Sequence, residues 1–440
     1  MKCYFETNEE SYYDEIASIL ETCRTVIVID QILDGIKEIQ DQVNVNEILS
    51  MGVELAQSSD HVEMVKLGIG LLGLFDLGEE RPFNKLILVL ALYDEFTLFT
   101  VVAAANWTHG NDIIFEIAKC VDSWGKIHAL AYLEPEDNEI RTWILRKGCP
   151  NEVTNTYNAL ICAEKGDLIS ALRQQSINKD LFESSSVIIE AMLHESPVPG
   201  MTSYNHAEEA LKLYLFHAES HAVTVKHLWY VLNIRSWVMK EKLSYLNDIT
   251  DCCNIIVNKP VWNKIITNAI TRRKDVFYAV SAASLLDMDI SSFLFRLVKR
   301  YPLELYPHIA GLFENPEIAA QLITLYESVL PLNDMAEGMN NYIVADKLQN
   351  EHMCLEYLLP LLASYPLQGV ELVITGLNSP VIRGRNMAYR AMSGWVESTE
   401  KPLAVLSPEL YAEVLRIHEI ENNENTKEHF STLTGNGMTN

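Results

Sequence analysis

The stretch "NVNEILSMGVELAQSSDHVEMVKLGIGLLGLFD", residues 44–76, decides the fold that this sequence predicts. Its first half begins at Asn44, a residue type that caps helix N-termini, and ends at a Ser-Ser-Asp cluster that favours a break. Its second half is apolar at positions 62, 65, 69, 72 and 75, which is the spacing of one helix face. Gly68, Gly70 and Gly73 lie inside this second helix, where each lowers helix propensity by up to about 1 kcal/mol. We therefore expect two helices that pack closely enough to offset the glycines.

The same alternation of apolar helical segments and short polar breaks continues along most of the chain. No series of segments alternates apolar and polar residues with the period of two that strands require. The longest apolar run, residues 85–107, is interrupted by Asp94 and Glu95, so we expect two buried helices there and no membrane span. A helical hairpin of this kind buries its apolar face only against neighbouring hairpins. The expected fold is all-α, a stack of helical hairpins, and a compact helical bundle is the alternative.

Two distant segments share one spacing of residue types. In "WGKIHALAYLEP" (124–135) and "RGRNMAYRAMSGW" (383–395), a glycine and a basic residue are followed by a small residue three positions on and an apolar residue four further on. We call this spacing the glycine–basic frame, and its basic residues are Lys126 and Arg385. Both segments resemble the second helix of a HEAT-like repeat. The resemblance implies an α-solenoid of HEAT-like helical hairpins, whose inner helices line a concave surface.

The frame supplies the candidate partner-binding residues, which are basic or large and aromatic. They are Trp124, Lys126, Arg383, Arg385 and Trp395. Exposed on an inner helix, such side chains would anchor a partner. The alternative is structural: the basic residues would form ladders with acidic groups of the next repeat, and the tryptophans would fill gaps between repeats.

The expected organisation has four parts. Residues 1–43 form an N-terminal helical cap, 44–195 the N-terminal repeats, 205–420 the C-terminal helical repeats, and 421–440 a disordered tail. The boundary between the two sets of repeats is placed in the Pro- and Gly-containing stretch "ESPVPGMTSYN" (195–205).

Composition limits the classes of partner. The formal net charge is −26, so the chain lacks the excess of lysine and arginine that binds nucleic acid or anionic membranes. The acidity either keeps an apolar-rich protein soluble or provides a face for a basic partner. The eight cysteines show no C-x-x-C spacing, and the polar, acidic N-terminus is no signal peptide. We expect a cytoplasmic protein.

Signs of catalysis are weak. The sequence holds no dinucleotide-binding, P-loop, nucleophile-elbow or H-E-x-x-H motif. His217 and His221, four positions apart, could together with His194 form a metal site, although ordinary surface or hydrogen-bonded histidines have the same spacing. The block 133–172 resembles uncharacterised bacterial proteins labelled limonene hydroxylases, which implies an oxygenase. Such an enzyme needs haem, flavin or a metal, and no signature of these occurs, so we expect no cofactor.

Together these observations predict a helical-repeat scaffold that binds a protein or peptide partner on its concave face. The alternative is an enzyme, or a small-molecule or metal-binding protein, with a cleft near His194, His217 and His221.

Overall fold

The computed structural model describes residues 10–39, 41–242, 246–336, 338, 340–345 and 347–434. Within these residues every regular element is helical, and the only pairing of the β type is an isolated bridge between Tyr342 and Val381. The expected all-α fold class is confirmed. No helix in the described ranges combines the length and the apolar character that crossing a membrane requires.

The chain divides into two compact units, Met1–Pro260 and Val261–Asn440. The boundary expected in 195–205 therefore lies inside the first unit. The helices on either side of that stretch are tied together: the rings of Phe182 and Tyr214 stack with centroids 5.4 Å apart, and the Tyr214 hydroxyl lies 2.9 Å from the Ser186 hydroxyl.

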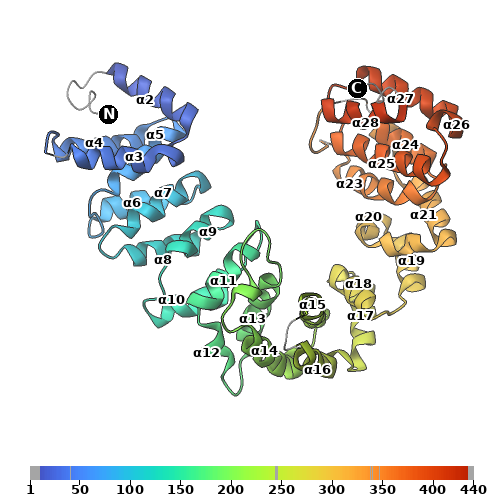
Figure 1. The fold of residues 1–440 in the computed structure, drawn as a ribbon, viewed down its shortest axis with the longest axis horizontal. Coiled ribbons are helices and arrows are strands. Elements are labelled where there is room, and N and C mark those ends of the chain that lie inside the picture. The colour runs from blue at the N-terminus through green and yellow to red at the C-terminus, as the bar shows by residue number, and fades with distance from the viewer. Residues whose placement is uncertain are drawn as a thin grey trace. The chain divides into compact units, whose positions relative to one another are not determined.

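The first unit is built from helices of mostly ten to seventeen residues, which Figure 1 draws from blue to green. Its α-helices are α2 (Glu10–Cys23), α3 (Thr25–Glu38), α4 (Val45–Ser58), α5 (Val62–Leu72), α6 (Arg81–Leu90), α7 (Asp94–Ala105), α8 (Gly110–Cys120), α9 (Ser123–Tyr132), α10 (Asn138–Trp143), α11 (Thr156–Lys165), α12 (Leu168–Leu172), α13 (Lys179–Met192), α14 (Ala207–His221), α15 (Val225–Glu241) and α16 (Leu246–Val257). A π-helix, η1 (Ile144–Gly148), and a 3-10 helix, η2 (Met201–Ser203), complete it.

The second unit is likewise helical. Its α-helices are α17 (Val261–Thr271), α18 (Val276–Leu285), α19 (Ser291–Arg300), α20 (Pro302–Leu305), α21 (Pro316–Val329), α22 (Leu332–Met335), α23 (Gln349–Leu358), α24 (Val370–Leu377), α25 (Ile382–Thr399), α26 (Leu403–Leu406), α27 (Pro408–Ile420) and α28 (Glu424–Thr434). Its 3-10 helices are η3 (Tyr306–His308), η4 (Ala310–Glu314) and η5 (Leu359–Ser364).

The first unit is organised as successive helix pairs. Helix α4 packs on α5, α6 on α7, and α8 on α9. In addition, α5 packs on α7, α7 on α9, α9 on α11, and α11 on α13. The capping residue expected for α4 is confirmed, because the Asn44 side chain accepts a hydrogen bond from the Asn46 N–H. The run expected to form two helices is confirmed as α6 and α7.

Gly68 in α5 and Gly73, which directly follows α5, bring neighbouring helices into backbone contact. A Cβ added to Gly68 would lie 2.6 Å from the Ala56 nitrogen and 2.9 Å from the Gly52 oxygen, both on α4. At Gly73 the nearest atom is the Ala103 Cα of α7, at 3.1 Å. The expectation of close packing is confirmed, and it lets α5 lie against both α4 and α7.

A buried ion pair and its hydrogen bonds join α3, α5 and α7. The Lys66 ammonium of α5 lies 2.8 Å from a Glu63 oxygen and 2.7 Å from a Glu95 oxygen on α7. The second Glu63 oxygen accepts a 2.6 Å hydrogen bond from the Thr25 N–H at the start of α3. Burial acts to raise the pKa of Glu63, but the hydrogen bonds from Lys66 and Thr25 outweigh it and hold that pKa below its usual value.

The C-terminal segment differs from expectation. Residues 421–440 were expected to be a disordered tail, yet Glu424–Thr434 form α28, which packs on α25 and α27. The reason is burial of the Phe430 ring and of Thr426, which the polar sequence around them does not indicate. Residues 435–440 lie outside the described part of the chain.

Candidate partner-binding surfaces

Lys126 of the glycine–basic frame is buried rather than exposed. It lies in the first turn of α9, and its ammonium donates a 2.7 Å hydrogen bond to the Pro150 carbonyl, beyond the next helix. The same ammonium lies over the Trp143 ring, 5.9 Å from its centroid. The side chain therefore ties α9 to the following segment and does not reach a partner.

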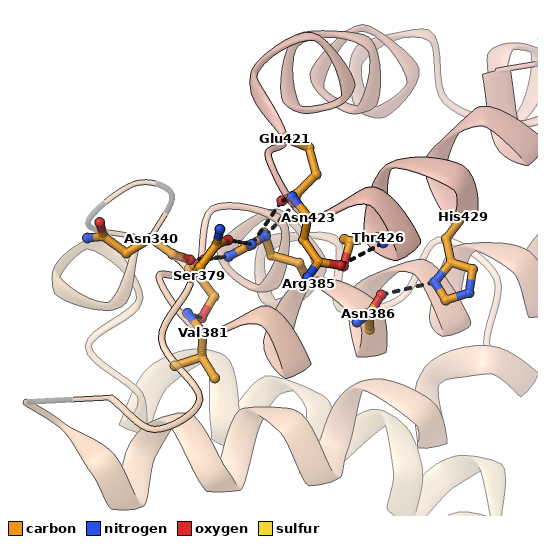
Figure 2. Close-up of polar contacts among 10 residues, drawn as sticks. Asn340, Ser379, Val381, Arg385, Asn386, Glu421, Asn423, Thr426 and His429 are labelled. Carbon is orange, nitrogen blue, oxygen red and sulfur yellow. Dashed lines mark hydrogen bonds and ion pairs between the residues drawn. The ribbon is translucent and has the colours of Figure 1, made fainter. Parts of the chain in front are cut away.

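Arg385, in the same position of the frame in α25, is completely buried. Figure 2 shows its guanidinium facing the Glu421 carboxylate, with Nε–Oε2 and Nη2–Oε1 distances of 2.7 and 3.0 Å. Its remaining donors bind the carbonyl oxygens of Asn340 and Ser379, both at 2.9 Å, and the Asn341 side chain at 3.3 Å. This bidentate, fully hydrogen-bonded arrangement fixes the segment before α23 and the end of α27 onto α25.

The other three candidates divide between the interior and the surface. Trp395 is buried, and its indole N–H donates a 2.7 Å hydrogen bond to the Leu362 carbonyl. Trp124 is exposed beside the Tyr157 ring, with centroids 5.2 Å apart. The Arg383 side chain is 72% exposed. Lys126, Arg385 and Trp395 are therefore corrected to structural residues, while Trp124 and Arg383 stay candidates.

Three basic–acidic pairs have the same separation along the chain. Their members are 36 residues apart, and the pairs are Arg173–Glu209, Lys212–Asp248 and Arg385–Glu421. Each joins one group of helices to the next, as the ladder alternative predicts. Exposed members of such a series contribute little individually, whereas the buried Arg385 pair is fully shielded from water.

The three histidines of the proposed metal site are engaged separately. The His217 Nε2 lies 2.9 Å from the carbonyl oxygen of Leu172, and the His221 ring stacks on that of Phe182. His194 is exposed, and its Nε2 lies 2.9 Å from the Glu190 carboxylate, one helical turn earlier. No three histidine, cysteine or acidic side chains in the described ranges are grouped as metal ligands would be.

A groove of about 620 Å³ runs along α3, α5 and α7 and ends at Tyr132, the last residue of α9. We call it the apolar groove, and its apolar lining residues are Val26, Ile29, Leu33, Leu74, Phe75, Leu98, Phe99, Val102, Ala103 and Tyr132. Several of these are open to solvent: Val26 is 52% exposed, Val102 38% and Tyr132 43%. Asp30, Lys37, Asp76 and Asn106 line the same groove, so its open surface is partly polar.

A second hollow, of about 450 Å³, lies on the other side of Tyr132. We call it the acidic hollow, because Asp112 of α8 and the carboxylates of Glu134 and Glu136 line it together with His109. Tyr132 lines both cavities and so separates an apolar compartment from an acidic one.

Tyr132 and the acidic loop after it are held by side chains from neighbouring helices. The Lys165 ammonium of α11 donates to the carbonyls of Ala131 and Leu133 at 3.0 and 2.8 Å, which satisfies the C-terminus of α9. Asn111 exchanges two hydrogen bonds with the backbone of Glu134, at 2.8 and 3.0 Å. The rim between the two hollows is therefore a fixed structure.

The second unit has a groove of about 560 Å³ between α23, α25 and residues 343–345. Arg383 lines it, and its guanidinium lies 3.5 Å from the Glu356 carboxylate on α23. Burial raises the pKa of Glu356, and Arg383 offsets part of that rise. Ile343 at the rim is 87% exposed.

The residues that line the apolar groove are not distinguished by the glycine–basic frame. The sequence does contain one signal for them: residues 26–29 of α3 are four consecutive apolar residues, which cannot all face the same side of a helix. Val26 and Ile29 of this run line the groove, whereas Ile27 is exposed outside it. Val102 and Tyr132 carry no such signal, because nothing in the sequence distinguishes either of them from the neighbouring apolar residues.

Comparison of this chain with known protein families, with curated proteins and with solved structures finds no match, so its function has to be argued from the geometry above.

Proposed function

We propose that this chain is an α-solenoid of HEAT-like hairpins that acts as a cytoplasmic scaffold for a protein or peptide partner. The apolar groove of the first unit would be the principal contact surface, on the concave side of its inner helices α3, α5, α7 and α9. The observation that carries this proposal is the open groove itself, in which Val26, Val102 and Tyr132 are exposed on packed helices.

The repeat assignment is supported by three features. Helix pairs follow one another with each inner helix on the next. The glycine–basic frame places Lys126 and Arg385 in equivalent roles, each reaching forward to the following segment. The separation of 36 residues recurs in three bridging pairs and lies in the range of helical-hairpin repeats.

An enzyme centred on His194, His217 and His221 is not what we propose. The His217 imidazole is committed to a backbone carbonyl and the His221 ring to an aromatic stack, so neither side chain is free to meet His194. Binding of nucleic acid is also disfavoured, since a net charge of −26 repels a polyanion.

The proposal is tested by Val102→Glu, which places a charge in the apolar groove. Val89→Glu is the matched control, because Val89 is 66% exposed on α6 and lines neither hollow of this unit. Tagged wild-type and variant proteins are used to capture partners from lysate of the source organism, and captured proteins are quantified by mass spectrometry. We expect the wild type and Val89→Glu to enrich the same protein and Val102→Glu to lose it. Equal capture by all three proteins would contradict the role of the groove.

A further inference from the structure

The apolar groove and the acidic hollow are adjacent, and Tyr132 lines both. We propose that the two together take a basic amphipathic peptide segment, whose apolar side chains fill the groove while a lysine or arginine passes Tyr132 into the acidic hollow. This inference rests on the proposed function and adds the chemistry of the partner.

The charges that line the two hollows are almost all negative. They comprise five carboxylates, one lysine and one histidine: Asp30, Asp76, Asp112, Glu134, Glu136, Lys37 and His109. The lysine does not offset the lining carboxylates, because its ammonium already pairs with the Asp34 carboxylate at 3.1 Å. A cationic partner therefore meets a surface with an excess of negative charge, which favours both its association and its orientation.

The carboxylates differ in how far the chain already neutralises them. Glu134 shares the Lys165 ammonium at 3.0 Å, and Asp112 lies 3.8 Å from the His109 ring. Among the described residues, no cationic side chain pairs with Glu136 or Asp30. One of these two carboxylates lines each hollow, so a segment with more than one basic residue could pair with both.

A basic segment is favoured over a neutral or an acidic one by the remaining charge of the protein. The chain carries −26, and carboxylates within about 8–10 Å of each other act together at physiological ionic strength. An acidic segment in the groove would face Asp30, Asp76 and the acidic hollow without a free cation to offset them. Amphipathic helices with one apolar and one basic face are a common class of groove-binding peptide.

The experiment uses the full-length protein and two synthetic peptides. The first carries leucines at helical spacing on one face and lysines on the other, and the second has every lysine replaced by glutamate. Binding of each labelled peptide is measured by fluorescence anisotropy at low and at physiological salt. The proteins compared are the wild type, Val102→Glu, a hollow variant with Asp112→Asn, Glu134→Gln and Glu136→Gln, and a matched control.

The matched control removes the same number of charges far along the chain, at exposed carboxylates of the second unit: Glu397→Gln, Glu419→Gln and Glu428→Gln. It separates recognition by the hollow from general attraction to an acidic protein. We expect the lysine peptide to bind the wild type and the control within about threefold of each other, and the hollow variant about tenfold more weakly, since three partly screened pairs are lost.

Two results would overturn the inference. Equal weakening in the hollow variant and in the control would show attraction to net charge alone. Binding of the glutamate peptide as tightly as the lysine peptide, lost in Val102→Glu, would leave the groove as a docking site while refuting its preference for a basic segment. Absence of binding by either peptide also counts against the inference, whereas the capture experiment with Val102→Glu would still decide the proposed function.

Discussion

Lys126 and Arg385 show what a buried basic residue does in this chain. Each begins inside a helix beside a glycine and extends its long side chain to a partner in the following segment, a carbonyl for Lys126 and a carboxylate for Arg385. A charge removed from water requires such a partner, and the Arg385 guanidinium donates five hydrogen bonds. The glycine–basic frame is thus a structural device at both sites.

Replacing Arg385 by alanine is expected to destabilise the second unit by about 3–5 kcal/mol, because the Glu421 carboxylate would be left buried without its counter-charge. Arg390→Ala is the matched control: its side chain is exposed on the same helix, and we expect a change below about 1 kcal/mol. Urea unfolding followed by circular dichroism measures both. Similar losses in the two variants would mean that burial of Arg385 does not matter for stability.

The burial of these residues could not be predicted from their own positions. The frame shows that Lys126 and Arg385 are equivalent, but it does not show whether each faces solvent. For Arg385 that depends on Glu421, a residue 36 positions away whose role appears only when α27 folds against α24 and α28 against α25. Exposed Trp124 and buried Trp395 lie in the two frame segments and illustrate the same difficulty.

At the scale of helices, close approach rather than propensity explains the composition of α5. Gly68 meets the backbone of α4 and Gly73 meets that of α7, so the small residues allow one helix to pack on two neighbours. The bounds of α4 were predictable because its cap and apolar spacing are local, whereas α5 ends at Leu72, four residues before the expected end of that helix. Helix α28 was not, since its sequence is polar and a single ring, Phe430, anchors it.

The substitution Gly68→Ala is expected to lower the free energy of unfolding by about 1–3 kcal/mol, because the added Cβ would press on backbone atoms of α4 that cannot move independently. The comparison is Gly35→Ala in α3, where no atom lies within 4 Å of the added Cβ. There we expect a gain of about 0.5–1 kcal/mol from helix propensity. Thermal unfolding of both variants tests the pair, and stabilisation by both would refute close packing at Gly68.

At the scale of the whole molecule, the division into units falls at Pro260 rather than in 195–205. Proline and glycine in the latter stretch suggest a linker, but the contacts of Phe182 with Tyr214 and of His217 with the Leu172 carbonyl cross it. Local composition could not reveal contacts between residues that are tens of positions apart.

Separate expression of residues 1–260 and 261–440 is expected to yield two helical fragments, each with its own cooperative thermal transition, because each unit has its own buried core. A cut between residues 204 and 205 serves as the control. It separates Tyr214 from Phe182, so the resulting fragments should lose helical signal or aggregate. Circular dichroism of the four fragments measures this, and equally stable pairs from both cuts would contradict the observed boundary.

The interval of 36 residues that three of the bridging pairs share has a consequence for changes in chain length. One residue inserted into a helix rotates everything beyond it by about 100° about the helix axis, which would turn Glu209 or Glu421 away from its arginine. Additional residues in the connecting turns leave those helix faces in place. Tolerated insertions and deletions should therefore concentrate in the turns. A change that includes helices would preserve the bridges between the remaining helices only if it adds or removes a whole hairpin.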